Sequence, residues 1–301
     1  MKYLYYPGCS LKSTGKPYEE SMLAVFSALG QTLEEIDDWN CCGATAYMSI
    51  SETKAFALSA RNFALAEQHN GKGEVNMVVP CAACYLGLNK AQRYLHEHDD
   101  LRQTVSKALA DAGLTYRGKV KVRHPLDVLV NDVGEEAIKK RVTQPLKGLK
   151  VACYYGCQLI RPYADFDDQH EPTSMDRIVT ALGGKPVDWP LKTRCCGGSL
   201  TGTVPDVGLR LSYVLLREAQ KRGCDVVITA CPLCQFNLEC YQPEMSRSND
   251  TKVNIPVVYF SQLMGVAFGL ERRALGLQRL FVPFALPVTA AEKQGGVHVS
   301  A

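Results

Sequence analysis

Apolar residues fall into short runs along the chain, and these alternate with longer stretches of helical spacing. Within residues 52–68, Phe56 with Phe63 and Leu58 with Leu65 recur seven positions apart, which places them on one face of a helix. The short runs, such as 75–79, have the length of buried strands. Because strand and helix alternate throughout, the pattern predicts an α/β fold of parallel sheets covered by helices.

The predicted elements follow the same order in the two halves of the chain. A strand comes first in each half, and then a helix that ends at Gly30 or Gly183. A longer helix, a second strand, a further helix, a closing strand and a last helix complete the half. The principal expected ranges are 2–6, 18–29, 52–68, 75–79 and 120–123 in the first half, and 150–154, 174–182, 207–222, 225–229 and 256–259 in the second.

Ten of the thirteen cysteines repeat in the same order in both halves. Each half has a single cysteine after its first strand, then a Cys-Cys-Gly triplet, then a Cys-x-x-Cys sequence at the end of a strand. The ten are Cys9, Cys41, Cys42, Cys81 and Cys84, and then Cys157, Cys195, Cys196, Cys231 and Cys234. This order indicates two similar halves related by internal duplication. We predict domains at 1–145 and 146–276, followed by a C-terminal tail at 277–301.

The cysteines that follow strands indicate where the sites should form. Cys9, Cys81, Cys157 and Cys231 each stand at the C-terminal end of a predicted strand. In open parallel sheets, binding sites form beyond these strand ends. We therefore expect each set of five cysteines to gather into one site.

Composition excludes several functions. The net charge of +3 is too small to predict nucleic-acid binding. No segment reaches the roughly 18–20 apolar residues of a membrane span, and the N-terminus lacks a long apolar export segment. Thirteen cysteines in such a chain indicate thiolates in a reducing compartment. We expect a cytoplasmic protein with neither a membrane span nor a nucleic-acid partner.

Five sulfurs in each half favour an iron–sulfur cluster over a zinc ion. Structural zinc takes four ligands, and so does a conventional cubane cluster. Two adjacent cysteines cannot easily bind one small ion without strain, but they can bind separate irons of a cluster. We expect Gly43 and Gly197, which follow the two pairs, to let the backbone approach the metal. A cluster of unusual shape, or four ligands with one free redox thiol, is therefore favoured. Zinc in one site, or a zinc-stapled interaction module, is the alternative.

The paired cysteine motifs resemble the cysteine-rich CCG domain. The whole chain, from Tyr3 to about Leu270, resembles the B subunit of heterodisulfide reductase and its bacterial relatives. The matching segments are 5–11 (YYPGCSL), 40–44 (NCCGA), 155–159 (YGCQL) and 162–182, which contains PTSMD. Segment 38–44 and the basic tail favour a bacterial member of this family, for which the sulfur-oxidation type is one candidate.

The resemblance implies that the ten cysteines ligate two noncubane [4Fe–4S] clusters. It implies an oxidoreductase acting on sulfur groups, in which the cluster irons rather than side chains cleave or form a disulfide or lipoate-bound sulfur bond in one-electron steps. The implied partners are a ferredoxin-like C subunit and a flavin-binding A subunit. The ferredoxin motif C-x2-C-x2-C-x3-C-P is absent from this sequence, as expected if electrons come from another subunit. The alternative is an electron-transfer CCG subunit of a flavin dehydrogenase complex.

Several residues outside the repeat remain candidates for a role at the sites. Cys153, Cys224 and Cys240 are expected to be buried free thiols, and the repeat favours Cys157 over Cys153 as a ligand. The counterpart of His124 in the second half falls near Phe260. We expect a structural role for His124 and keep a role as a hydrogen-bond partner of the cluster as the alternative. Arg161 and Arg194 would offset thiolate charge.

Overall fold

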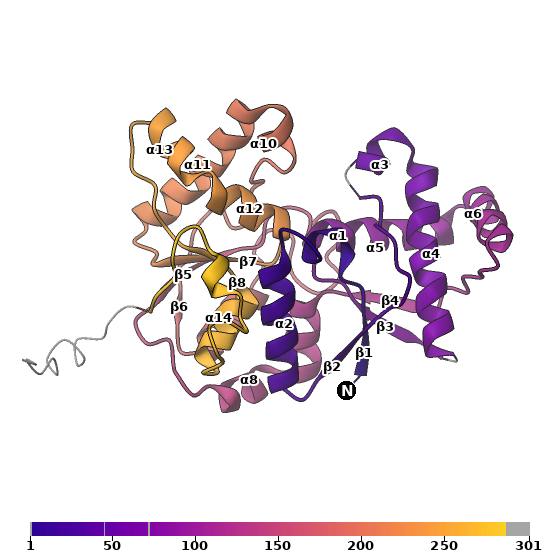
Figure 1. Ribbon diagram of the computed structural model, residues 1–301, viewed down its shortest axis with the longest axis horizontal. Coiled ribbons are helices and arrows are strands. Elements are labelled where there is room, and N and C mark those ends of the chain that lie inside the picture. Colours follow the sequence, from indigo (N-terminus) through magenta and orange to yellow (C-terminus); the bar gives the residue numbers. More distant parts are fainter. Residues whose placement is uncertain (1, 45, 72, 287–301) are drawn as a thin grey trace, which may run out of the picture.

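The computed structural model of the chain describes residues 2–44, 46–71 and 73–286 (Figure 1). The tail prediction for 287–301 lies outside these residues. The first half forms a sheet of four parallel strands in the order β2-β1-β3-β4. Its strands are β1 (Lys2–Tyr5), β2 (Thr32–Glu35), β3 (Val75–Val78) and β4 (Val120–Arg123). Its helices are α1 (Gly8–Leu11), α2 (Lys16–Ala28), α3 (Ala46–Ile50), α4 (Glu52–Asn70), α5 (Ala82–Glu97), α6 (Asp99–Asp111), α7 (Pro125–Asp127) and α8 (Glu135–Arg141), with a π-helical segment η1 (Val128–Val133) before α8.

The second half repeats this arrangement. Its four parallel strands lie in the order β6-β5-β7-β8, which is the same order once the strands are numbered within each half. The strands are β5 (Lys150–Tyr154), β6 (Lys185–Pro186), β7 (Val226–Thr229) and β8 (Val257–Tyr259). The helices are α9 (Ser174–Ala181), α10 (Leu200–Thr203), α11 (Pro205–Lys221), α12 (Pro232–Cys240), α13 (Gln242–Ser248) and α14 (Phe260–Ala267), and a 3-10 turn η2 (Leu277–Arg279) follows. The predicted fold class is confirmed.

The edge strands β2 and β6 were not predicted from the sequence. β2 carries Glu34 and Glu35, and β6 is two residues long and includes Pro186. Charged residues and proline are common on edge strands because one side of the strand is left unpaired. The apolar pattern therefore identifies the inner strands and the opposite edge strands, β4 and β8, but gives no signal for β2 and β6.

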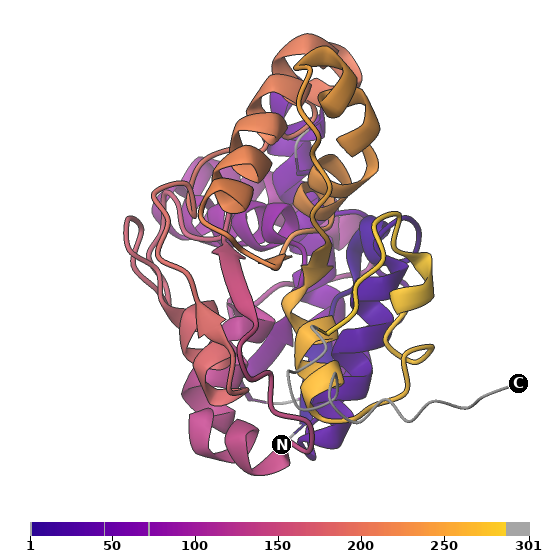
Figure 2. The same cartoon turned by 90° about the vertical axis from the view of Figure 1, so that its left-hand side faces the viewer.

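Each half packs its last helices against the other half. α14 of the second half packs against α2 of the first, and the two helices lie side by side in both views (Figures 1 and 2). The hydroxyls of Ser21 and Ser261 meet at 2.7 Å in this buried contact. Similarly, α8 of the first half packs against α9 of the second. The described residues of both halves consequently share one hydrophobic core.

The described part of the C-terminal tail returns to the body of the protein. Phe284 is buried, and Arg272 donates a hydrogen bond to its carbonyl oxygen. Glu239 accepts hydrogen bonds from the backbone N–H groups of Phe281 and Val282. The segment up to Phe284 thus covers the chain's own core, while the Phe281 side chain is exposed.

Candidate functional site

All five repeated cysteines of the second half line one cavity. The cavity has a volume of about 170 Å³ and is bordered by Cys157, Cys195, Cys196, Cys231 and Cys234. Ala82 of the first half also lines it. A water molecule needs only about 10–15 Å³ of such a volume, so the cavity can hold a group of several atoms.

The local fold explains why these five sulfurs meet. β5 ends at Tyr154, and Gly156 turns the chain with a φ of 69° before Cys157. Cys231 is the N-cap of α12, and Cys234 lies in its first turn. The unpaired N–H groups and the dipole at a helix N-terminus favour a thiolate, and the pKa of Cys231 is lowered here, whereas hydrogen bonds with Cys196 and Cys231 raise the pKa of Cys234. The expected Cys-x-x-Cys at the start of a helix is therefore present.

The cysteines of the first half are arranged in the same way. Cys9 lies in α1, Cys81 is the N-cap of α5 and Cys84 lies in the first turn of α5. The Sγ atoms of Cys9 and Cys41 lie 3.9 Å apart. Cys42 completes the set, since its sulfur lies within hydrogen-bonding reach of those of Cys41 and Cys84. Hydrogen bonds from these two thiols lower the pKa of Cys42 well below its usual value.

Burial of the sulfurs follows one pattern in both sites. Three cysteines in each are buried: Cys42, Cys81 and Cys84 in the first, and Cys196, Cys231 and Cys234 in the second. Cys9 and Cys41 are exposed, as is Cys195, and Cys157 is half-buried. Each set therefore has a buried inner side and an outer side that reaches the protein surface.

The repeat extends to side chains that support the sites. Tyr6 donates a hydrogen bond to the carbonyl oxygen of Asn40 at 2.8 Å, and Tyr154 does the same to Arg194 at 2.7 Å. Asn40 and Arg194 each precede a vicinal cysteine pair. These hydrogen bonds tie the end of the first strand to the Cys-Cys loop in both halves, a relation that the repeated tyrosines in the sequence could have revealed.

A second supporting pair holds the backbone of the buried vicinal cysteines. Ser59 donates a hydrogen bond to the carbonyl oxygen of Cys42 at 3.1 Å. Ser212 donates one to the carbonyl oxygen of Cys196 at 2.8 Å. The serines lie in α4 and α11, so the long helix of each half fixes the position of its Cys-Cys loop.

Glycine is required beside the sulfurs at two equivalent positions. A Cβ atom on Gly8 would lie 3.1 Å from Sγ of Cys84, and one on Gly156 would lie 3.3 Å from Sγ of Cys234. Both glycines have positive φ angles, of 67° and 69°. The sequence analysis did not identify this pair as part of the sites.

Gly43 and Gly197 pack against helices. The nearest atoms to a Cβ on Gly43 belong to Ala55 and Leu58 of α4, and a Cβ on Gly197 would lie 2.9 Å from the Cα atom of Gly208 in α11. The backbone N–H of Gly197 also donates a hydrogen bond to Sγ of Cys195 at 3.3 Å, and the expectation that these glycines let the backbone approach a metal stays a prediction. Their lack of a side chain lets the Cys-Cys loops lie directly on the long helices.

The two sites are adjacent. Ala82, next to Cys81, lines the cavity of the second site, and its backbone N–H lies beside the Cys231 sulfur. A hydrogen bond from Cys234 and several backbone N–H groups, including this one, lower the pKa of Cys231. A Cβ atom on Gly15, the N-cap of α2, would lie 3.1 Å from Pro232 of α12, and α1 also contacts α12. The inner sides of the two sites, at Cys81 and Cys231, thus face one another.

The surroundings of the two sites are unequal. Asn237 in α12 directs its amide nitrogen to Sγ of Cys196, 3.4 Å away, and also donates a hydrogen bond to the Gly198 carbonyl. The residue at the same place in the first Cys-x-x-Cys helix is Gly87, which cannot make this contact. Hydrogen bonds from Cys157 and Cys196, with a smaller contribution from the Arg161 charge, lower the pKa of Cys195 to about 2.

The remaining candidates lie apart from the sulfurs. Cys153 is buried in β5, and burial raises its pKa. The other groups that affect this pKa are Asp176, Lys192 and Cys224. Cys224 is also buried and Cys240 half-buried, and all three are free thiols. Arg194 has an exposed side chain.

Both ring nitrogens of His124 contact backbone groups. Its Nδ1 accepts a hydrogen bond from Leu126 N–H, and its Nε2 lies 3.0 Å from the Pro80 carbonyl oxygen. Burial lowers the pKa of His124 to about 4, so the ring is neutral at physiological pH. The structural interpretation is confirmed. Its counterpart is Tyr259 rather than Phe260, since His124 and Tyr259 are the N-caps of α7 and α14 after the closing strands.

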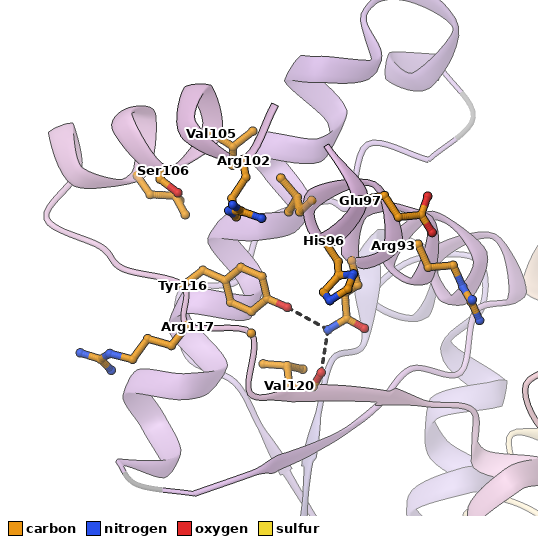
Figure 3. A pocket seen from close by; sticks show the side chains of 13 residues that line it. Arg93, His96, Glu97, Arg102, Val105, Ser106, Tyr116, Arg117 and Val120 are labelled. Carbon is orange, nitrogen blue, oxygen red and sulfur yellow. Dashed lines mark hydrogen bonds between the residues drawn. The ribbon is translucent and has the colours of Figure 1, made fainter. Parts of the chain in front are cut away.

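A larger cavity lies elsewhere in the first half. It has a volume of about 590 Å³ and is lined by residues of α5, α6 and the segment leading into β4 (Figure 3). Tyr116 borders it and accepts a hydrogen bond from Gln92. None of the ten repeated cysteines lines this cavity, so it is separate from the sulfur sites.

The donor set of each site fits a group larger than one metal ion. Among residues 2–44, 46–71 and 73–286, no three His, Cys, Asp or Glu side chains meet closely enough to hold a single ion. The second site instead spreads five sulfurs around 170 Å³. Thiolates are the usual ligands of iron–sulfur clusters. Gly8 and Gly156 keep the space beside Cys84 and Cys234 free.

Comparison with known proteins identifies the family. The model of the cysteine-rich domain family, CCG, matches the chain twice, at residues 3–89 and 151–239. These two ranges contain all ten repeated cysteines. The chain belongs to the CCG family and carries two copies of its cysteine-rich domain.

Its relatives are subunits of two kinds of oxidoreductase. The chain is 33% identical to the 8-methylmenaquinol:fumarate reductase membrane anchor subunit of Wolinella succinogenes, over 92% of this chain and 95% of the relative. It is 32% identical to the B subunit of the ferredoxin:CoB-CoM heterodisulfide reductase of Methanosarcina mazei, over 80% of each. A protein of Archaeoglobus profundus that is named as similar to the heterodisulfide reductase B subunit is 29% identical over 90% of this chain and 92% of its own. The similarity to the heterodisulfide reductase B subunit expected from the sequence is confirmed, at about 30% sequence identity.

One solved structure has the same fold. A hypothetical protein from Helicobacter pylori superimposes with a TM-score of 0.75 at 16% identity, over 94% of this chain. This chain spans about half of the Helicobacter chain, 52%. Within the described residues, no helix is both long and apolar enough to cross a membrane.

Proposed function

We propose that this chain is the catalytic iron–sulfur subunit of a heterodisulfide reductase-like complex. The observation that carries the proposal is the pair of adjacent five-cysteine sites in a chain related to the heterodisulfide reductase B subunit. We further propose that it works in the cytoplasm with a ferredoxin-like subunit and a flavin-binding subunit. The bacterial sulfur-oxidation type remains part of this proposal.

The ten repeated cysteines would hold two [4Fe–4S] clusters. Cys42, Cys81 and Cys84 would hold the buried side of the first and Cys196, Cys231 and Cys234 that of the second, because these thiols are the buried ones. The noncubane form is proposed because each set has five sulfurs where a cubane uses four. When bound, the clusters supply electrons one at a time.

The outer sides of the sites leave room for a substrate to approach. Cys9, Cys41 and Cys195 are exposed, so each set of sulfurs reaches the surface on one side. Reduction of a disulfide RSSR′ takes two electrons and two protons and gives RSH and R′SH. Two adjacent sites can deliver those two electrons, and the substrate would be a mixed disulfide or a lipoate-bound sulfur.

A dye-linked assay tests this function. The chain is loaded anaerobically with iron and sulfide, and reduced viologen is then supplied with a lipoamide or mixed thiol disulfide. The proposal predicts one dithiol, or two thiols, released for every two viologens oxidised. Cys81→Ala should abolish the reaction, whereas Cys153→Ala should leave it unchanged. Loaded protein that takes electrons from viologen but releases no thiol from the disulfide would contradict the proposal.

A second candidate is an electron-transfer subunit without disulfide chemistry. The 33% identity to a fumarate reductase subunit over nearly the whole chain favours it. On this alternative, the loaded chain would exchange electrons with dyes and a flavoprotein partner but release no thiol. The same assay therefore separates the two functions.

A further inference from the structure

Two buried tyrosines stack at the contact between the halves. Tyr18 lies in the first turn of α2, and Tyr259 is the N-cap of α14. Their ring centroids are 4.4 Å apart and the planes differ by 4°. Tyr18 is completely buried and Tyr259 is 1% exposed. The α2–α14 contact therefore holds the two rings in one fixed orientation.

Neither hydroxyl has a hydrogen-bond partner among the described residues. Leaving a buried polar group unpaired destabilises a protein. Two such groups side by side are unusual, since buried tyrosine hydroxyls usually find a partner. The pair is therefore arranged for an acceptor that the described residues do not supply.

The nearby charged groups indicate where that acceptor lies. Burial, the Tyr259 hydroxyl and then the thiols of Cys231 and Cys81 raise the pKa of Tyr18. Burial and then Cys231, Glu239, Cys81 and Cys234 raise the pKa of Tyr259. Both hydroxyls thus remain protonated donors. The strand register pairs Tyr259 with Thr229, two residues before Cys231. Gly15, three residues before Tyr18, packs against Pro232, next to Cys231. Cys81 and Cys231 form the facing inner sides of the two sites.

We propose that Tyr18 and Tyr259 donate hydrogen bonds to sulfur at the junction of the two sites and so set the reduction potential of both. The inference rests on the proposed iron–sulfur function. Hydrogen bonds to cluster sulfurs help determine reduction potentials. Reduction adds negative charge, which a hydroxyl donor stabilises, so the pair raises both potentials. His124, the counterpart of Tyr259, cannot serve in this way because its ring nitrogens are bound to backbone.

Removal of the hydroxyls alone tests the proposal. Tyr18→Phe, Tyr259→Phe and the double variant are loaded anaerobically, and their iron and acid-labile sulfide are measured. Midpoint potentials then come from redox titration followed by EPR. Each variant should keep its iron, and each single substitution should move both potentials to more negative values, with the largest shift in the double variant. Tyr116→Phe, whose hydroxyl bonds Gln92 far from the sulfurs, is the matched control and should cause no shift.

Two results would overturn the proposal. The first is a double variant that is loaded like the wild type and has unchanged potentials, as expected if water alone satisfies the hydroxyls. The second is a shift confined to one site. Unfolding of the metal-free chains provides an independent check, because loss of two unpaired hydroxyls should leave the double variant at least as stable as the wild type. A wild-type chain that takes up neither iron nor sulfide would instead contradict the proposed function itself.

Discussion

A Cβ atom on Gly8 would lie 3.1 Å from the Sγ atom of Cys84. Gly156 stands in the same relation to Cys234, at 3.3 Å. Both backbones turn with positive φ just before the first cysteine of their half. The glycine thus serves two needs at once, since the turn requires its backbone freedom and the sulfur requires the space.

Alanine at Gly8 should damage the first site and spare the second. The positive φ alone costs about 1–2 kcal/mol for a non-glycine residue, and the added methyl group would also displace the Cys84 sulfur. Gly30→Ala is the control, because Gly30 has a φ of 70° and no atom within 4 Å of the methyl group that alanine would add. Both variants should lose similar free energy of unfolding, but only Gly8→Ala should lower bound iron towards half. Equal iron in the two variants would show that the glycine serves only the turn.

Asn237 should affect the reduction potential of the second site alone. Its amide contacts Sγ of Cys196, and Gly87 offers no such group to the first site. Asn237→Leu should therefore move the midpoint potential of the second site to a more negative value while the first stays unchanged, as measured by redox titration. Asn89→Leu on the first Cys-x-x-Cys helix is the control, since the Asn89 amide bonds the Tyr85 carbonyl. A shift at both sites would argue against a local effect.

Glu239 should make the metal-free chain less stable as the pH rises. Burial raises the pKa of Glu239 to about 7 against an ordinary value of 4.5, although hydrogen bonds from Val282, Gln235 and Phe281 oppose the shift. Between these values the folded state binds more protons than the unfolded state, so stability falls with increasing pH. The loss amounts to roughly 3 kcal/mol at most.

Glu239→Gln isolates this contribution. Glutamine keeps a carbonyl oxygen for the N–H groups of Phe281 and Val282 but does not titrate. The difference in free energy of unfolding between wild type and variant, measured by urea titration, should change between pH 4.5 and 7 and be flat above pH 7. A difference independent of pH would mean that Glu239 has an ordinary pKa.

The sequence predicts the inner framework of the fold well. Apolar runs locate β1, β3 and β4 and their counterparts, because these strands are buried by helices. The edge strand β2 is missed because its residues Glu34 and Glu35 lack the apolar pattern. The packing of α14 on α2 is also missed, since an apolar helix face does not specify its partner.

The same limit applies to the sites. The cysteines are identifiable because they repeat in order, and Asn237 could be found by setting it against Gly87 in the repeat. Tyr18 and Tyr259 could not be found in this way. They are distant in sequence and belong to different halves, and they meet only through the α2–α14 contact.

Metal and sulfide analysis of anaerobically prepared protein tests the central claim most directly. The account predicts about eight irons and about eight acid-labile sulfides per chain, the content of two [4Fe–4S] clusters. Cys157→Ala should reduce both numbers towards half, whereas Cys153→Ala should leave them unchanged. Zinc without sulfide, or loss of iron on substitution of Cys153 but not of Cys157, would contradict the account.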